Sequence, residues 1–211
     1  MAKKEYFCIV HTETTINDRV YDFAAVVCDR NGNIVSKCAV IVSDSAEFEL
    51  FYDNNNAEWS RQNATKKKTD YFKMIESGSR IVASVAAINR WLEKVIGKYN
   101  PTLTAYNISF DFGKCKNTGI DLSGFKSQFC LWHLSRELFA KKKAYKNFAM
   151  QNHYFGNRTA KGNMTIKTNA EIMAHYVTGQ YAAEPHTALE DAQFFELPIF
   201  FLSTSLFSSM K

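Results

Sequence analysis

The sequence has few of the residues that break a chain. Its 211 residues include only 3 prolines and 9 glycines, and they contain no internal repeat and no segment typical of a domain linker. This length suits one compact domain that buries a core without disulfides or structural metals. We therefore expect a single domain over residues 1–211.

Paired cysteines are also lacking. The 5 cysteines are odd in number and form no Cys-x-x-Cys motif. This argues against a disulfide framework and against a zinc ribbon, and it is typical of a reducing cytosol. We expect a cytoplasmic protein in which several of the cysteines are small core residues.

No hydrophobic run is long enough to cross a membrane. The N-terminal run at 6–10 is too short for a signal peptide. The Phe-rich segment 194–207 is interrupted by Glu196, Pro198 and several serines. We expect this segment to be a final helix that packs on the core, and we expect no membrane partner.

Charge of one sign is only mildly in excess. The net charge is +5 and the sequence pI is about 8.9, which weakly favours a polyanionic partner. Lysines cluster at 66–68 and at 141–143. Each run is either a phosphate contact or an ordinary solvated surface.

The first third of the sequence predicts an antiparallel meander. The apolar run at 6–10 is typical of a central strand, and 20–28 and 34–42 are two further strands. Asn31-Gly32 between the last two is typical of a tight turn.

The rest of the sequence alternates between helices and strands. The stripe of apolar residues from Ile81 to Ile96 predicts a helix closed by Gly97 and Pro101. Further on we expect strands at 102–106 and 128–132, helices at 109–117, from 132 to about 150, at 169–178 and from 187 to the C-terminus, and a loop at 156–162. This order predicts an α/β fold with an RNase H-like mixed five-stranded sheet, a three-strand antiparallel meander plus two parallel strands, flanked by helices.

Residues 44–78 differ from the rest of the chain. They are polar, rich in Asn and Lys, and contain scattered aromatic residues. We expect an insert of irregular structure with one or two short helices. Its aromatic residues Tyr52, Trp59 and Tyr71 either face a substrate or pack in the core.

Two segments place a carboxylate near the end of a strand. His11 and Glu13 are two residues apart at the end of the first strand, so their side chains share a face. Asp111 follows the strand at 102–106, and Asn107 or Ser109 can cap the helix whose first turn holds it.

A third carboxylate begins the last helix. Thr187 and Glu190 have the spacing of a capping box, which places Asp191 in the first turn. His186 then stands just outside the helix and is able to turn toward the same cleft.

Together the three segments resemble the motifs of the DEDDh (proofreading-subunit) 3′–5′ exonuclease superfamily. They read His11-x-Glu13, Asn107-x-x-Phe110-Asp111 and His186-x-Ala188-x-x-Asp191, and the match extends over about residues 5–200. The small size also resembles that of exonucleases encoded by bacteriophages, which would place the protein in the host cytoplasm.

The resemblance implies phosphodiester hydrolysis with two Mg²⁺ or Mn²⁺ ions. In the family pattern, Glu13 and Asp191 would ligate the first ion and Asp111 would help to hold the second, because hard cations take oxygen ligands. His186 would be the general base for the attacking water.

The substrate implied is a single-stranded 3′ end, DNA being favoured over RNA. Such ends are held by base stacking on aromatic residues and by contacts to phosphates. The candidate contacts beside the site are Thr14, Thr15, Asn107 and Phe110. More distant basic candidates are the lysines at 66–68, Arg158 and Lys161.

Position 11 departs from the family pattern, in which the first motif begins with an aspartate that bridges both ions. His11 offers one lone pair when neutral, and imidazole suits Zn, Ni or Cu better than Mg. We therefore expect the chain to be inactive or strongly impaired with Mg²⁺. The histidine is either an introduced inactivating change or a natural feature of a binding protein.

Two competing interpretations remain. One is a pseudo-nuclease, a non-catalytic nucleic-acid-binding or protein-interaction module on the same fold. The other, less favoured, has His11 recruit zinc with Glu13 and Asp191, while His133, His153 and His175 are structural. The sequence leaves open whether the partner is a polymerase, a host protein or short oligonucleotides alone.

Overall fold

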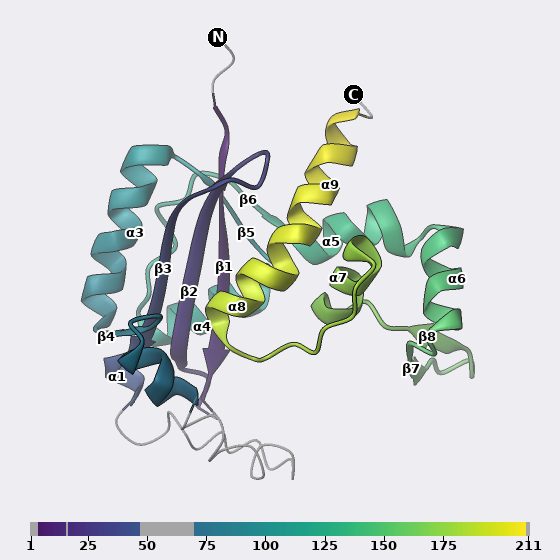
Figure 1. The fold of residues 1–211 in the computed structure, drawn as a ribbon, viewed down its shortest axis with the longest axis horizontal. Coiled ribbons are helices and arrows are strands. Elements are labelled where there is room, and N and C mark those ends of the chain that lie inside the picture. The colour runs from purple at the N-terminus through teal and green to yellow at the C-terminus, as the bar shows by residue number, and fades with distance from the viewer. Residues whose placement is uncertain (1–3, 16, 47–69, 210–211) are drawn as a thin grey trace.

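The fold is built on one mixed sheet, which runs through the middle of the molecule (Figure 1). The computed structural model describes residues 4–15, 17–46 and 70–209. The strand order is β4-β3-β2-β1-β5-β6. The strands are β1 Tyr6–Thr14, β2 Val20–Asp29, β3 Ile34–Val42, β4 Ile81–Ala83, β5 Thr102–Ala105 and β6 Gln128–Cys130.

The predicted RNase H-like sheet is confirmed, with one strand more than expected. Strands β1, β2 and β3 are antiparallel neighbours, while β5 pairs parallel with β1 and β6 pairs parallel with β5. The sixth strand, β4, pairs parallel with β3 at the edge of the sheet. Strand β1 is also longer than predicted and carries both His11 and Glu13.

The helix predicted from Ile81 was placed too early. Ser84 is the N-cap of α3 (Val85–Tyr99), and its side chain accepts a hydrogen bond from the backbone N–H of Ala87. Ile81 therefore lies in β4, where it is exposed. The predicted stop at Gly97 was also wrong, because the helix continues through Gly97 to Tyr99, and Asn100, just before Pro101, is its C-cap in the left-handed conformation.

Helices cover both faces of the sheet. Successive residues of β1 alternate between two cores, since Phe7 and Ile9 belong to one cluster while Cys8 and Val10 belong to the other. Helix α3 and α4 (Ile108–Thr118) contribute to the cluster of Cys8. Helices α5 (Leu131–Ser135), α7 (Ala170–Thr178) and α9 (Leu197–Ser209) contribute to the cluster of Phe7. His11 and Glu13 continue the side of Phe7.

The helical segment predicted after β6 is interrupted. It consists of α5, a π-helical segment Arg136–Ala140 and α6 (Lys143–Gln151). The loop predicted at 156–162 is wrong in part, because β7 (Phe155–Arg158) and β8 (Met164–Ile166) form a small antiparallel hairpin. Figure 1 shows this hairpin and α6 at the side of the molecule, away from the main sheet.

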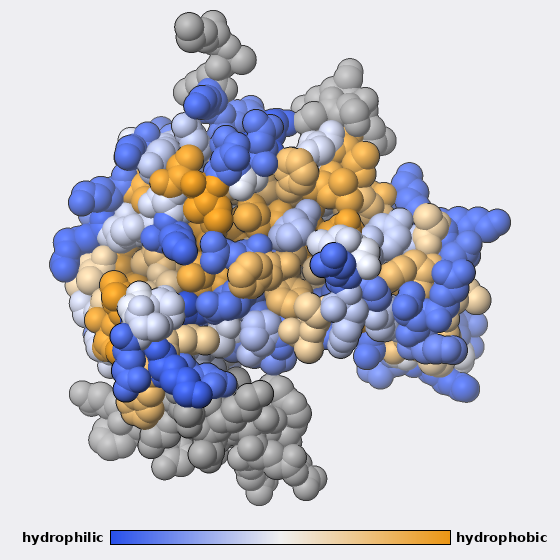
Figure 2. Space-filling view, viewed as in Figure 1, coloured by the Kyte–Doolittle hydropathy of each residue, from blue (hydrophilic) through white to orange (hydrophobic). Residues whose placement is uncertain are grey.

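The predicted C-terminal helix packs on the core as expected, but in three pieces. These are α8 (Ala188–Glu190), a π-helical segment Asp191–Glu196 and α9. Within α9 the Phe200 side chain is buried, while Phe201 and Leu206 are exposed. Figure 2 shows apolar residues along this helix at the surface. In the part of the chain that the structure describes, no helix has the length and hydropathy needed to span a membrane.

The insert predicted at 44–78 is described only at its ends. Helix α1 (Ser43–Ala46) begins it, and residues 70–76 are helical. Tyr52, Trp59 and the lysines at 66–68 lie outside the described residues. The interpretation of Tyr71 as a substrate contact is wrong, because its ring is fully buried and its hydroxyl donates to Asp22 at 2.9 Å.

A buried ionic network ties this segment to β2 and α8. Arg80 is 1% exposed, its Nε lies 3.3 Å from Asp22 Oδ1, and its guanidinium also pairs with Glu190. Asp22 accepts from the Tyr71 hydroxyl and from the backbone N–H of Ala188 at 2.9 Å. Burial raises the pKa of Asp22, and the Arg80 charge opposes this shift.

We expect Arg80→Ala to destabilise the fold strongly. It would leave the Asp22 carboxylate buried without its cation, which costs about 3–5 kcal/mol. Urea unfolding followed by circular dichroism measures the loss. Arg90→Ala is the matched control, because Arg90 is exposed on α3 and its removal should change stability by less than about 0.5 kcal/mol. Equal losses in the two variants would contradict the role of Arg80.

Candidate active site

A cleft of about 490 Å³ opens at the C-terminal end of β1. Its walls come from β1, the start of α4, the start of α7 and the segment before α8. Six acidic or histidine residues line it, namely His11, Glu13, Asp111, Glu184, His186 and Glu196. The three predicted motifs therefore meet in one place, as their positions in the sequence suggested.

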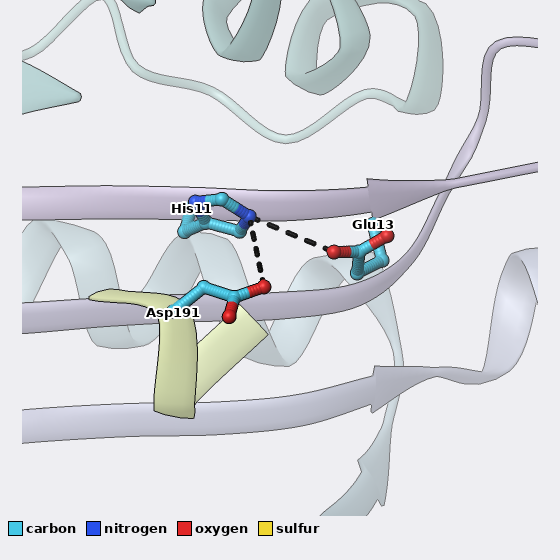
Figure 3. A group of neighbouring side chains, drawn as sticks. All are labelled: His11, Glu13 and Asp191. Atoms are coloured by element: carbon cyan, nitrogen blue, oxygen red, sulfur yellow. Dashed lines mark ion pairs between the residues drawn. The ribbon is translucent and has the colours of Figure 1, made fainter. Parts of the chain in front are cut away.

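His11, Glu13 and Asp191 form a group whose ligand atoms face one another (Figure 3). His11 Nε2 lies 3.6 Å from Glu13 Oε1 and 3.6 Å from Asp191 Oδ2. One ligand atom from each residue falls within 4.8 Å of the other two. In Figure 3 the side chains of His11 and Glu13 project from the same strand, and the side chain of Asp191 projects toward them from the C-terminal helical segment.

A fourth residue, Glu196, holds the histidine from its other side. Its Oε1 is 2.7 Å from His11 Nδ1, and its Oε2 accepts the backbone N–H of Tyr106 at 3.1 Å. The Glu196 side chain is only 1% exposed. The imidazole is therefore fixed by a buried carboxylate at Nδ1 and directs Nε2 toward the other two acids.

The backbone of the C-terminal segment explains why Asp191 and Glu196 both reach His11. In an α-helix, residues five apart point about 140° away from each other. Residues 191–196 form a π-helical turn instead, in which i and i+5 are hydrogen-bonded neighbours and so lie on one face. Such turns are frequent at functional sites.

Asp111 lies in the cleft but apart from this group. It is in the first turn of α4 after the N-cap Asn107, as predicted, although Asn107 makes no side-chain capping bond. Its Oδ1 accepts from the Thr12 hydroxyl at 2.9 Å. Thr12 points to the opposite side of β1 from His11, and this places Asp111 nearer to the α4 side of the sheet.

His186 lines the cleft just outside the last helix, as predicted. It has a positive φ of 56°, a conformation that non-glycine residues seldom adopt. The predicted capping box is wrong, because Thr187 is the N-cap but makes no side-chain capping bond. Asp22 accepts the first N–H of α8 instead, and Glu190 pairs with Arg80.

The predicted substrate contacts are only partly at the cleft. Thr14, Asn107 and Phe110 line it, and the Phe110 ring is 45% exposed, with Lys114 Nζ 4.8 Å from its centroid. Thr15 is buried and is not among the lining residues, because its backbone turns to bond Arg19.

Several lining residues were not found from the sequence. Glu184 precedes the third motif, and Trp132 follows β6, where its indole N–H donates to Thr168 at 3.0 Å. Tyr106 precedes the second motif and donates its backbone N–H to Glu196. Only Tyr106 could have been inferred, since it adjoins Asn107. The others come from segments whose path over the cleft is set by tertiary packing.

Burial makes ionisation of the acids in the cleft unfavourable. Burial raises the pKa of Glu184 to about 7 and also raises the pKa values of Asp111 and Asp191, whereas the charge of His11 opposes each shift. Burial lowers the pKa of His11, but its contacts with Glu13 and Glu196 raise it well above the ordinary value. Positive charge on the imidazole and negative charge on the acids therefore stabilise each other.

This donor set does not fit two hard cations bridged by the residue at position 11. His11 has one nitrogen directed at the cluster and no second donor atom for another ion. Asp111, the acid expected to hold the second ion, is bonded to Thr12 and is not within the group of His11. The donor atoms directed at one point are one imidazole nitrogen and one oxygen from each of two carboxylates.

Neither a protein-family model nor a curated protein matches the sequence. Among solved structures, the chain is similar to the zinc-bound form of the E. coli ExoI–ssDNA complex, with 13% identity and a TM-score of 0.49. The similarity covers 99% of this chain and 41% of that one, so the chain spans less than half of the ExoI length. We infer nothing about function from a similarity of this size, and the fold assignment rests on the strand order.

We expect the metal-free chain to lose stability as pH rises. Burial raises the pKa values of Asp111 and Glu184 to about 7 and that of Asp191 to about 9, so from about pH 4 up to these values the folded chain keeps protons that the unfolded chain has released. The free energy of unfolding therefore falls over this range, and the loss of the proton from His11 acts in the same direction.

Urea unfolding in a chelator at about pH 5, 7 and 9 measures this dependence. Asp191→Asn should flatten it and raise stability at the highest pH, because a neutral amide replaces the buried carboxylate. Glu93→Gln, at an exposed glutamate of α3, should leave the slope unchanged. A free energy of unfolding that increases from about pH 5 to 9 would contradict the raised pKa values of these acids.

Proposed function

We propose that the chain is a metal-dependent 3′–5′ exonuclease of the DEDDh type that acts on single-stranded ends. The observation that carries this proposal is the convergence of three separate motifs on one cleft. Glu13 and Asp191 meet beside His11, and Asp111 and His186 line the same walls. A merely structural role would not require ionisable residues from three distant segments to share one hollow.

His186 is the residue that we assign to proton transfer. It lies outside α8, at the cleft wall, where an imidazole can take a proton from the water that attacks the terminal phosphorus. Its positive φ turns it away from the helix that follows. The water oxygen bonds to phosphorus and the bond from phosphorus to the 3′ oxygen breaks. His186 releases its proton to solvent, the 3′ oxygen takes one up from solvent, and the products are a nucleotide and a shortened strand.

The walls of the cleft suit an unpaired strand. Phe110 and Trp132 offer aromatic surfaces for base stacking, and Asn107 and Thr14 offer polar groups for the terminal sugar and phosphate. Stacking of this kind accepts every base, which agrees with a sequence-independent exonuclease. We propose DNA before RNA as the substrate.

His11 limits this activity with Mg²⁺ or Mn²⁺. A nitrogen donor and an absent bridging carboxylate lower the affinity for hard ions. The chain in its present sequence is therefore an impaired exonuclease with these ions. Restoring an aspartate at position 11 would restore the full acidic set of the family pattern.

The alternative is a pseudo-nuclease that binds single strands without cleaving them. One contact favours it, since Glu196 is buried and has His11 as its partner at 2.7 Å. An aspartate at position 11 would put a second acid near Glu196. The contact with Glu196 favours a natural histidine over an introduced one. A natural histidine agrees with a protein that has lost Mg²⁺-dependent catalysis.

We also propose that the protein is cytoplasmic. All five cysteines are free in the structure, which agrees with a reducing cytoplasm. From the family resemblance alone, we also propose a phage origin and a polymerase or host protein as partner. We propose one domain for residues 1–211, because the buried residues of the described helices, α6 included, join the two core clusters on the faces of one sheet.

We expect His11→Asp to digest a 5′-labelled single-stranded DNA from its 3′ end in Mg²⁺. Regaining about 3 kcal/mol of transition-state stabilisation would make it roughly 100-fold faster than the unchanged chain. Because Glu196 would stand near the new acid, His11→Asp with Glu196→Gln should be at least as active. Gel analysis of labelled products, with RNA in parallel, measures the rates.

Glu13→Ala in the His11→Asp background is the control and should abolish cleavage. Digestion by the unchanged chain in Mg²⁺ at the rate of the variant would overturn the role given to His11. Retained binding without cleavage in every variant would establish the pseudo-nuclease.

We further expect His186→Asn, in the His11→Asp background, to lower the turnover rate by roughly 10²–10⁴-fold, the usual contribution of a general base. Oligonucleotide affinity, measured by fluorescence anisotropy, should change little. His133→Asn is the matched control, because His133 is an exposed imidazole of α5 outside this cleft. Turnover that survives in His186→Asn would assign the proton transfer elsewhere.

A further inference from the structure

We propose that His11, Glu13 and Asp191 form a binding site for one divalent ion of the zinc class. This deepens the proposed function, on which it rests for the identity of the cleft, by replacing the expected pair of hard ions with a single transition-metal ion. Its evidence is the placement of donor atoms around one point, and its test does not depend on cleavage.

The spacing of the donor atoms suits a single ion. His11 Nε2 is 3.6 Å from one oxygen of Glu13 and 3.6 Å from one oxygen of Asp191. With metal–ligand bonds of about 2.0–2.1 Å, two ligands of a tetrahedral zinc ion stand roughly 3.3 Å apart. The three donor atoms lie within 4.8 Å of one another, so side-chain movements of up to about 1.5 Å would bring them to this spacing.

The imidazole is already oriented as a metal ligand. When His11 Nδ1–H donates to Glu196, the lone pair of the neutral ring is on Nε2, which faces Glu13 and Asp191. Histidines that bind metals usually donate their other nitrogen to a carboxylate or a carbonyl in this way. Glu196 is itself held by the backbone N–H of Tyr106.

Asp191 provides an independent indication of a cation. Its side chain is 0% exposed, and in the described part of the chain neither carboxylate oxygen has a hydrogen-bond partner. A buried carboxylate without hydrogen bonds is costly unless a cation or a proton accompanies it. Oδ2 faces His11 Nε2 across the gap in which the ion would lie (Figure 3).

The donor types select the ion. One imidazole nitrogen with two carboxylates is a mixed set that zinc and its neighbours accept, whereas Mg²⁺ requires oxygen donors and an octahedral shell. The two carboxylates balance the charge of one divalent ion. Because His11 and Glu13 line the open cleft, a fourth position remains for water or a phosphate oxygen.

The test is metal binding by the full chain after treatment with a chelator. Calorimetry with Zn²⁺, Co²⁺ and Mg²⁺ gives affinity and stoichiometry, and the visible absorption of bound Co²⁺ reports its coordination. We expect one Zn²⁺ per chain and tighter binding of Zn²⁺ than of Mg²⁺. Glu196→Gln should weaken Zn²⁺ binding by roughly 10–100-fold, as loss of an outer partner does.

His11→Ala and Asp191→Asn remove direct ligands, so each should weaken Zn²⁺ binding by more than that roughly 100-fold limit. His133→Ala, which removes an exposed imidazole elsewhere, should bind like the unchanged chain. Circular dichroism confirms that each variant is folded. Two Mg²⁺ ions per chain, Zn²⁺ binding unaffected by His11→Ala, or no Zn²⁺ binding by the folded chain would each overturn the inference.

The outcome is separable from that of the proposed function. Cleavage by His11→Asp in Mg²⁺ tests the exonuclease whether or not the unchanged chain binds zinc. Binding of one Zn²⁺ by the unchanged chain supports the metal site whether or not any variant cleaves.

Discussion

The buried acids at the end of β1 repel one another, and the rest of the site is arranged around the few positive charges that offset this repulsion. Asp191 and Glu196 are almost fully buried, and both turn toward the His11 ring. On the neighbouring strand Asp22 is equally buried and is matched by Arg80. The end of the sheet thus holds two adjacent groups of acids, each organised by one cation.

The π-helical turn at 191–196 brings together two of the acids around His11. It begins at Asp191 and ends at Glu196, so that one wide turn presents two carboxylates to the same imidazole. An unbroken α-helix from Thr187 would have turned Glu196 away from β1. The irregularity of the helix is therefore a condition for the geometry of the cleft, as is common for such turns at functional sites.

The central sheet was predictable because local pattern and tertiary burial agree there. The strand at 34–42 was predicted with the bounds that the structure has, and those at 20–28 and 102–106 were within one residue, since each is a β-prone run between clear breaks. The edge strand β4 was missed because three residues, two of them exposed, are too few to outweigh the apolar stripe that follows.

The motif residues could be assigned to one cleft from the sequence, but their partners could not. Glu196 was interpreted as a polar interruption of an apolar helix, because its role depends on a π-helical turn that no residue pattern announces. Asp22 and Arg80 are 58 positions apart, and only folding brings them together. For Tyr71 the sequence left a substrate contact and core packing both open, and only the structure shows that its hydroxyl donates to the buried Asp22.

Glu190 and Asp191 are consecutive residues that belong to different groups, one held by Arg80 and the other facing His11. The peptide bond between them therefore connects the network of Arg80, Asp22 and Tyr71 to the acids around His11. Such linkage is reciprocal, since a ligand that stabilises one conformation is in turn bound more tightly by it. If a ligand in the cleft bound one position of Asp191 more tightly than another, the contacts of Glu190, Arg80 and Tyr71 that accompany that position would be stabilised with it.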